Sequence, residues 1–448
     1  MIADTDLAQM IQPGRVHRGI YTDPQIFELE LERIFGRAWI YVAHESQVRR
    51  PGDYITTRHG RDRIIVTRHT DGALHAMYNR CTHRGAAVCA TRSGNTKTFV
   101  CPYHAWSFRT DGALDGIPHG AAGYGAGLQG KMDELGLERL PRVASYRGFV
   151  FASKAAEGVG LPEFLGPAIR DVFDNFIDRS PSGELEVAGG KMVQVYRGNW
   201  KFQIENSIDL LHPSILHKNA VDAAAPVERA EDMDYGVRTA VELNGQNWHT
   251  FREWDQMGVH SLPRGHCYMG SFFKKSDKPI DEEARFGSDD AFRFDSQAAY
   301  KAALVARHGR EKTEEILTFS RHNTIVYPNL FVNPRMQQVR ILHPTAHDRT
   351  EQHSEVLRFV GAPEEGFQIA VRLLSANNSP SSMATADDHE VFEQMQRSLG
   401  RGSNPWLDMS RALGQDVADG VDRRAPGTSE SPMRNQHRAW ADYMTGAL

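Results

Sequence analysis

The chain has 448 residues and a formal net charge of −5, and 40% of its residues are hydrophobic and 24% charged. A chain of this length forms roughly two or three domains, and the composition is that of a globular protein with a core of ordinary size. The negative charge gives no case for a nucleic-acid partner, and no apolar run approaches the roughly 20 residues that span a membrane.

The first predicted element is a helix at 20–39, where Asp23 and Pro24 suit the N-cap and the first helical position. We assign this helix to an N-terminal segment at 1–45, which is expected to pack on the C-terminal domain. The N-terminus has no apolar region typical of a secretory signal, so we expect a cytoplasmic protein.

A small antiparallel β domain is predicted at 46–154. From Gly52 onward, short segments rich in β-branched and aromatic residues are separated by turns at 69–72 and 110–112. The domain is expected to close with a strand at 146–153.

The rest of the chain, 155–448, mixes helices and strands without regular alternation, which predicts an antiparallel sheet flanked by helices and an α+β fold class overall. The polar stretch 401–432 is expected to be a loop. The expected helices are 161–178, 385–400 and 434–447, and the expected strands are 191–200, 324–333 and 336–345.

The strongest local signal is Cys81-Thr-His83 followed by Cys101-Pro-Tyr-His104. Two Cys-His pairs suit a Rieske [2Fe–2S] cluster, in which two thiolates hold one iron and two imidazoles hold the other. The alternatives are a zinc site or four unrelated residues. Zinc sites with two cysteines and two histidines usually group Cys with Cys and His with His, so the interleaved order favours the cluster.

These two motifs, CTHRG and CPYHAW, resemble the Rieske motifs of the large subunits of aromatic ring-hydroxylating oxygenases. Respiratory-chain Rieske proteins carry two further cysteines in these loops, where this chain has Ala86 and Tyr103. One departure from the family is Ala105, which stands where glycine is common.

A second candidate metal site contains His212 and His217. Residues five apart do not share a face of a straight helix, but Pro213 disfavours a helix that continues through His212 and lets the backbone turn. In a chain with 20 histidines such a pair is easily accidental. Spacing alone therefore leaves a surface or packing role open.

The resemblance strengthens this second site. The mononuclear-iron motif of the same family is E-N, then D-x-x-H-x₄-H, and it is matched by Glu205, Asn206, Asp209, His212 and His217. In some relatives the spacing from Asn to Asp is one residue longer, which makes Asn206 the least certain match.

The resemblance places the third iron ligand, a carboxylate, in the segment 384–393 and at Asp388, with Asp387 as the second choice. The alternative is an acidic first turn of a helix, which the helix dipole favours whether or not a metal binds. The expected iron ligands are therefore His212, His217 and Asp388.

Asp209 is expected to be a catalytic residue that does not bind iron. It stands three residues before His212, and a metal-bound imidazole usually donates its second N–H to a carboxylate or a carbonyl. In relatives this aspartate also meets a Rieske histidine of the next subunit, which corresponds here to His104. The alternative is a helix cap worth about 1 kcal/mol.

The resemblance covers nearly the whole chain and implies a terminal oxygenase with one Rieske cluster and one mononuclear Fe(II). Such an enzyme uses O₂, and electrons from a separate NAD(P)H-dependent reductase or ferredoxin, to hydroxylate an aromatic ring. We expect cis-dihydroxylation, with an aromatic carboxylic acid as a candidate substrate, in an α₃β₃ assembly with a small beta subunit or in a homotrimer. The alternatives are a Rieske monooxygenase or demethylase, and an electron-transfer protein without catalysis of its own.

The substrate pocket is expected to be largely apolar with a few polar anchors. Candidate lining segments are 206–217, 251–270 and 321–335. Arg321 or Arg335 could clamp a substrate carboxylate through two parallel hydrogen bonds, although each is as readily a surface or packing arginine.

Overall fold

The computed structural model describes residues 2–125, 131–132, 134–218, 254–273, 296–319, 321, 323–380, 382 and 384–448. Its contacts divide the chain into two compact units. The large unit comprises Met1–Ile34 and Leu165–Leu448, and the small unit comprises Phe35–Phe164. Within the described part of the chain, no helix has both the length and the apolar character needed to cross a bilayer.

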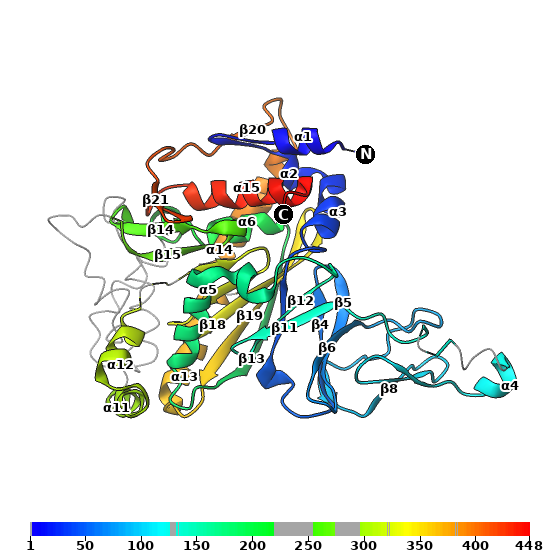
Figure 1. Ribbon diagram of the computed structural model, residues 1–448. Coiled ribbons are helices and arrows are strands. Elements are labelled where there is room, and N and C mark those ends of the chain that lie inside the picture. The colour runs from blue at the N-terminus through cyan, green and yellow to red at the C-terminus, as the bar shows by residue number, and fades with distance from the viewer. Residues whose placement is uncertain are drawn as a thin grey trace. The chain divides into compact units, whose positions relative to one another are not determined.

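The small unit consists of antiparallel strands in three sheets, ordered β6-β5-β4-β7, β10-β9-β8 and β11-β12-β3 (Figure 1). A short helix, α4 (Gly120–Tyr124), follows β10. The strands are β3 (Ile40–His44), β4 (Asp53–His59), β5 (Asp62–Arg68), β6 (Leu74–Tyr78), β7 (Ser93–Asn95), β8 (Thr98–Val100), β9 (Ser107–Arg109), β10 (Leu114–Gly116), β11 (Arg142–Tyr146) and β12 (Phe149–Ser153).

The antiparallel β domain expected from the sequence is present, but its limits differ from 46–154. Strand β3 pairs with β12, so the chain enters this unit before residue 46. The turns expected at 69–72 and 110–112 are closed by backbone hydrogen bonds, from the Gly72 N–H to the His69 carbonyl at 3.0 Å and from the Gly112 N–H to the Arg109 carbonyl at 2.8 Å.

The large unit is built around a nine-stranded antiparallel sheet, ordered β13-β19-β18-β17-β16-β15-β14-β22-β21, with a separate sheet β1-β2-β20, as counted among the described residues. Figure 1 shows β13, β19 and β18 side by side. The strands are β1 (Ile11–Gln12), β2 (Arg15–His17), β13 (Leu185–Tyr196), β14 (Met257–Ser261), β15 (Cys267–Phe272), β16 (Thr324–Val326), β17 (Leu330–Asn333), β18 (Gln338–Ala346), β19 (Arg349–Phe359), β20 (Trp406–Asp408), β21 (Val417–Asp419) and β22 (Asp422–Pro426).

Helices flank this sheet, which confirms the α+β class. They are α1 (Asp4–Gln9), α2 (Gly19–Thr22), α3 (Pro24–Arg33), α5 (Leu161–Asp178), α6 (Trp200–Asn206), α7 (Pro213–Leu216), α11 (Gln297–His308), α12 (Arg310–Leu317), α13 (Glu364–Asn378), α14 (Thr385–Leu399) and α15 (Ser431–Thr445).

The helix expected at 20–39 is shorter in the structure and divided in two. The Asp23 carboxylate accepts a hydrogen bond from the Gln25 N–H at 2.7 Å, and Pro24 occupies the first turn of α3, as the sequence predicted. Helix α3 nevertheless ends at Arg33, because the chain from Ile40 onward is committed to β3.

Two other expectations for the large unit were wrong in detail. The single strand expected at 324–333 is the hairpin β16–β17, with a cis Tyr327-Pro328 bond between the strands. The stretch 401–432, expected to be a loop, contributes β20, β21 and β22. Strands of three to five residues are too short to show a periodic pattern, and they form here because distant strands, β2 for β20 and β14 for β22, offer backbone groups to pair with.

A buried carboxylate ties the N-terminal helix to the large unit. Glu30 on α3 is fully buried and receives the Lys201 ammonium at 2.5 Å. It also accepts the indole N–H of Trp200 at 2.8 Å and that of Trp440 at 2.6 Å. Helices α3, α6 and α15 thus share one buried charge, which compensates the cost of taking Lys201 out of water.

A second carboxylate on α6 repeats this arrangement. Glu205 accepts the Tyr21 hydroxyl at 2.9 Å, and its carboxylate lies 3.0 Å from Nε2 of His437 on α15. Burial, and after it the Glu205 charge, hold the pKa of Tyr21 well above its usual range, so the hydroxyl stays protonated and donates. Helix α6 is therefore held in place from both sides.

We predict that Glu30→Gln destabilises the large unit by about 3 kcal/mol, because Lys201 then remains buried without a countercharge. Burial lowers the pKa of Lys201 and the Glu30 charge opposes this effect, so removing that charge makes the buried ammonium less favourable still. Chemical denaturation followed by tryptophan fluorescence measures the effect. The matched control is Glu32→Gln, an exposed position on the same helix, and equal midpoints for the two variants would show that the pair is unimportant.

Candidate metal centres

Cys81 and His83 lie in a tight loop of the small unit. The Cys81 N–H donates to the Ala86 carbonyl and the Gly85 N–H donates to the Cys81 carbonyl, both at 2.8 Å. Gly85 has a φ of 78°, a left-handed conformation that glycine adopts without steric cost, and a side chain at this position would meet open space. Backbone conformation, not lack of room, thus explains the glycine.

Cys101 and His104 lie in a second loop with the same hydrogen bonds. The Cys101 N–H donates to the Trp106 carbonyl at 2.8 Å, and the Ala105 N–H donates to the Cys101 carbonyl at 3.0 Å. Ala105 has a φ of 55°, so it adopts the left-handed conformation that Gly85 adopts in the first loop. The alanine that departs from the family pattern therefore keeps the loop geometry, at a strain of about 1 kcal/mol.

The four predicted cluster residues divide into a buried sulfur side and an accessible imidazole side. Cys81 and Cys101 are each 3% exposed and belong to the core of the small unit. His83 is partly buried, His104 is exposed, and their ring centroids lie 4.7 Å apart. The His83 ring also stacks on Trp106 at 4.8 Å. Two buried thiols and two more accessible imidazoles match the donor set of a Rieske cluster.

The two remaining cysteines are buried and unpaired, as expected of small apolar residues. Cys89 packs in the core of the small unit. The Cys267 sulfur accepts a hydrogen bond from the Gln436 amide at 3.3 Å. Burial raises the pKa of Cys267 to about 12, so this thiol stays protonated and unreactive.

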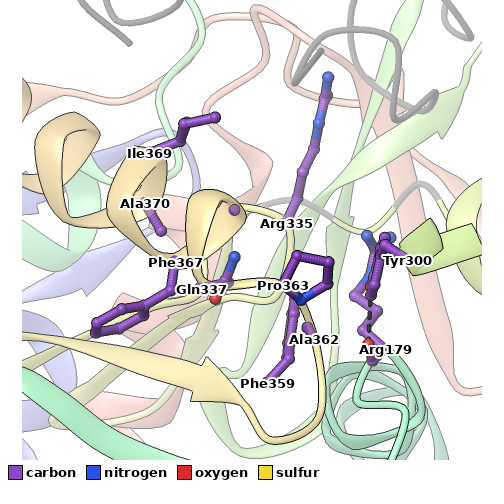
Figure 2. Close-up of a pocket in the computed structure, with 11 residues that line it drawn as sticks. Arg179, Tyr300, Arg335, Gln337, Phe359, Ala362, Pro363, Phe367, Ile369 and Ala370 are labelled. Atoms are coloured by element: carbon purple, nitrogen blue, oxygen red, sulfur yellow. Dashed lines mark hydrogen bonds between the residues drawn. The ribbon is translucent and has the colours of Figure 1, made fainter. Parts of the chain in front are cut away.

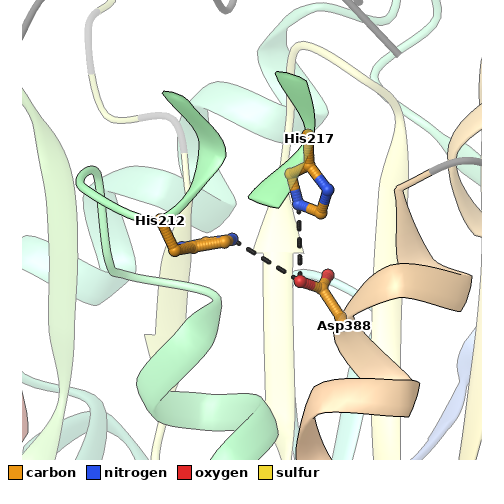
Figure 3. A group of neighbouring side chains, drawn as sticks. All are labelled: His212, His217 and Asp388. Carbon is orange, nitrogen blue, oxygen red and sulfur yellow. Dashed lines mark ion pairs between the residues drawn. The ribbon is translucent and has the colours of Figure 1, made fainter. Parts of the chain in front are cut away.

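The second predicted metal site brings together side chains from two distant segments of the large unit. Helix α6 ends at Asn206, Pro213 opens the short helix α7, and His212 and His217 lie at the two ends of α7. Asp388 lies in the first turn of α14. One donor atom from each of His212, His217 and Asp388 lies within 4.8 Å of the others (Figure 3).

The donor atoms of this triad point at one another. The Asp388 Oδ1 lies 3.4 Å from the His217 Nε2 and 3.7 Å from the His212 Nε2. Both Nδ1 atoms are buried without a hydrogen-bond partner. Two imidazoles and one carboxylate on one side of a point are the donor set that binds non-haem iron and leaves positions open for other ligands.

Asn206 lies between the ligands. Its side-chain amide donates to the Asp388 Oδ1 at 3.0 Å and lies 3.1 Å from the His212 Nε2. The sequence motif had made Asn206 the least certain member, and the structure places it in direct contact with two of the three candidate ligands.

The surroundings of Asp388 and His212 favour the protonation states that bind a cation. Burial alone raises the pKa of Asp388, but hydrogen bonding to His217 and the nearby imidazoles outweigh it and leave the pKa below its ordinary value. Burial lowers the pKa of His212, against the opposing charges of Asp388 and Asp209. A neutral imidazole and an ionised carboxylate are the protonation states that bind metal.

The hydrogen bond expected between the Asp209 carboxylate and His212 is absent from the structure. The Asp209 carboxylate instead accepts the Leu211 N–H at 2.7 Å and lies 3.9 Å from the Arg411 guanidinium. A carboxylate two residues before an N–H forms this local turn readily, and the turn competes with the expected contact. The Asp209 side chain remains 24% exposed, so a further partner can reach it.

Of the two candidate aspartates, Asp388 lies beside His212 and His217, and of the two candidate arginines, Arg321 forms an ion pair. Asp388 is buried in the triad, whereas Asp387 is not a member. Arg321 pairs with Asp171 at 2.9 Å and donates to the Ala168 carbonyl. Of the candidate lining segments, positions 251–253 and 322 lie outside the described residues.

Arg335 lines a separate pocket between α13 and the end of β19 (Figure 2). None of the triad residues lines this cavity. Its lining is formed by Arg179, Tyr300, Arg335, Gln337, Phe359, Ala362, Pro363, Gly366, Phe367, Ile369 and Ala370.

The sequence analysis did not single out Arg340, whose charge acts on the triad. The charge of Asp388 raises the pKa of Arg340 while burial lowers it, with a net value of about 10. The alternation of apolar and polar residues in β18 was the only available signal, and it does not distinguish a partly buried arginine from an exposed one.

Comparisons with known proteins match both units. The Rieske [2Fe–2S] domain family matches residues 38–143, and the catalytic domain of the ring-hydroxylating alpha subunits matches residues 183–446. The chain is 34% identical to toluate 1,2-dioxygenase subunit alpha of Pseudomonas putida, over 97% of this chain and 92% of that protein.

Two further similarities have comparable extent. The chain is 32% identical to 2-halobenzoate 1,2-dioxygenase large subunit of Burkholderia cepacia, over 96% of this chain and 89% of that protein. The structure superimposes on naphthalene 1,2-dioxygenase from Rhodococcus sp. with a TM-score of 0.78 and 25% identity, and the match covers 100% of this chain and 99% of that one.

Proposed function

Since this chain belongs to the large (alpha) subunits of the Rieske non-haem iron ring-hydroxylating dioxygenases, we propose that its substrate is an aromatic carboxylic acid. The family carries one [2Fe–2S] cluster and one mononuclear iron in each alpha subunit. The reaction is cis-dihydroxylation of an aromatic ring with O₂. The printed names of two relatives, toluate and 2-halobenzoate dioxygenase, support an acid as substrate.

We assign the cluster to Cys81, His83, Cys101 and His104, and the iron to the triad His212, His217 and Asp388. The observation that carries the second assignment is the convergence of three donor atoms within 4.8 Å from segments far apart in the sequence. Two neutral imidazoles with one carboxylate leave part of the coordination sphere open for O₂ chemistry, which iron supplies when it is bound.

The residues of the chain have separate tasks in this reaction. Asp388 and the two histidines fix the position of the metal, and the amide of Asn206 orients Asp388 through its hydrogen bond. Asp388 is buried, whereas His212 and His217 are partly exposed, so the triad remains accessible to small molecules. The exposed imidazole of His104 offers the cluster an edge for electron exchange.

We propose that a separate reductase supplies the electrons, directly or through a ferredoxin, and that the subunit works in a ring-shaped trimer with or without a small beta subunit. In this assembly Asp209 links the iron site to His104 of the next subunit. Two features support the link: the Asp209 side chain is partly exposed, and it lies within three residues of an iron ligand.

The triad assignment predicts that His212→Ala and Asp388→Ala lower turnover more than about 100-fold, since even partners outside the coordination sphere contribute 10- to 100-fold. Metal analysis should show three irons and two acid-labile sulfides per wild-type chain and one iron fewer in each variant. The reduced cluster should keep its electron paramagnetic signal. The matched control is Asp387→Ala, and an inactive Asp387→Ala beside an active Asp388→Ala would reverse the assignment.

The link predicts that Asp209→Asn slows turnover by at least about 10-fold while the fold, the trimer and the reducible cluster remain intact. Rapid mixing of the reduced protein with O₂ and substrate follows reoxidation of the cluster directly. If Asp209 only supports the local turn at Leu211, the variant loses stability but reoxidises at the wild-type rate, and that rate would refute the link.

Anaerobic reduction followed by a single turnover tests the reaction itself. We expect a cis-dihydrodiol carboxylate from benzoate, 3-methylbenzoate or 2-chlorobenzoate, identified by mass and by incorporation of both atoms of labelled O₂. A phenol with one labelled atom would indicate a monooxygenase, and loss of a methyl group from an N-methyl substrate would indicate a demethylase. An electron-transfer protein would give no product at all.

A further inference from the structure

Arg340 lies on β18 in the middle of the large sheet. It pairs across the sheet with Phe331 on β17 and with Ser354 on β19. Its guanidinium carbon lies 3.8 Å from the centroid of the Phe331 ring. Part of the side chain remains accessible, but the guanidinium is enclosed closely enough that burial lowers its pKa to about 10. The group therefore keeps its positive charge at neutral pH.

This guanidinium has no polar partner within the part of the chain that the structure describes. Its Nε is buried without a hydrogen bond, and no carboxylate of the described residues forms an ion pair with it. Arg358 on the neighbouring strand β19 lies over the Phe367 ring at 4.9 Å but is also paired, with its guanidinium 3.4 Å from the Glu364 carboxylate. Arg424 on β22 resembles Arg340, because its Nε is buried without a hydrogen bond and its guanidinium lies over the Phe273 ring. A buried donor without a partner is costly, so a guanidinium that no described residue compensates is available to bind an anion.

Arg340 lies on the face of the sheet that leads to the triad. Alternate residues of a strand share a face, so Arg340 lies on the same side as Gln338. The Gln338 amide donates to Asn378 at the end of α13 at 2.5 Å, and the Asn378 amide donates to Thr385, one turn before Asp388 in α14. The pKa of Arg340 responds to the charge of Asp388, which agrees with this placement.

The same face carries an unpaired acceptor. Gln352 on β19 pairs across the sheet with Leu342, two residues along β18 from Arg340. Its amide donates to Gln194, but its Oε1 is buried without a partner. An unpaired donor and an unpaired acceptor on one buried face are the polar anchors expected in a largely apolar ligand site.

We propose that Arg340 binds the carboxylate of the aromatic acid and thereby determines that the enzyme accepts acids; this inference rests on the proposed function of the triad site. The planar guanidinium offers two parallel N–H groups to a carboxylate, and the Phe331 ring below it fixes its orientation. A neutral hydrocarbon would leave the charge unpaired, so the arrangement selects against it.

The role is tested by equilibrium binding to the oxidised holoenzyme, measured by calorimetry with benzoate and its neutral isostere benzamide. For Arg340→Gln we expect benzoate binding to weaken by roughly 10- to 100-fold, which corresponds to one charge-assisted pair. Benzamide binding should change less than about 3-fold. Arg340→Lys keeps the charge without the planar fork and should lie between the wild type and Arg340→Gln.

The control is Arg358→Gln, which removes a paired arginine from the neighbouring strand and should bind benzoate as the wild type does. Thermal unfolding separates binding from folding: Arg340→Gln should lower the midpoint only slightly, because the contact with the Phe331 ring is lost but no described polar group loses a hydrogen bond or an ion pair. A strongly lowered midpoint with unchanged benzoate affinity would show a structural role and overturn the proposal.

The two inferences can fail independently. If the wild type converts aromatic acids but Arg340→Gln binds and converts them equally well, Arg340 is not the anchor while the proposed function stands. If the wild type binds benzoate through Arg340 but forms no oxygenated acid, the anchor stands and the proposed reaction is wrong. If the wild type binds neither benzoate nor 2-chlorobenzoate, the anchor proposal is overturned.

Discussion

The large unit depends on one buried charge, the Glu30 carboxylate, which receives Lys201 and two indole N–H groups. Through these contacts the N-terminal helix fixes the start of α6, and Glu205 fixes its other end against α15. Asn206 is the last residue of α6 and contacts the triad, and the chain continues from there to His212. Removing the charge from this helix bundle would therefore disturb both the fold and the position of the metal ligands.

The two metal centres are built on opposite principles. The cluster site uses two short loops with the same hydrogen-bond pattern, and each loop supplies its own Cys-His pair. The iron site uses an interrupted helix and the first turn of a second helix far along the chain. The first arrangement leaves His104 exposed and His83 partly buried, which suits the electron exchange that we propose for it. The second buries Asp388 and leaves His212 and His217 partly exposed, which suits the reaction with substrate and O₂ that we propose for it.

The large sheet forms part of the core and, through Arg340, also determines which substrates bind under our proposal. Most residues on β17 and β18 are buried and apolar, as the core of a sheet requires. Arg340 is an exception that destabilises the protein by itself and gains a partner when an anion binds. Under our proposal, specificity for acids arises from this charge, because the substrate carboxylate supplies the partner that no described residue provides.

The sequence by itself determined what is local. The cluster residues, the cap at Asp23 and the break before His212 follow from residues within a few positions of one another, because turns, caps and proline act over that range. Only the tertiary structure brought Asp388, and not Asp387, together with the two histidines, placed Asn206 against Asp388 and His212, and turned Asp209 toward Leu211. It also formed the short strands of 401–432 and left the Arg340 Nε without a hydrogen bond among the described residues. These features depend on which distant segments meet, and the pairing of distant segments is set by packing across the sheet, which no local pattern encodes.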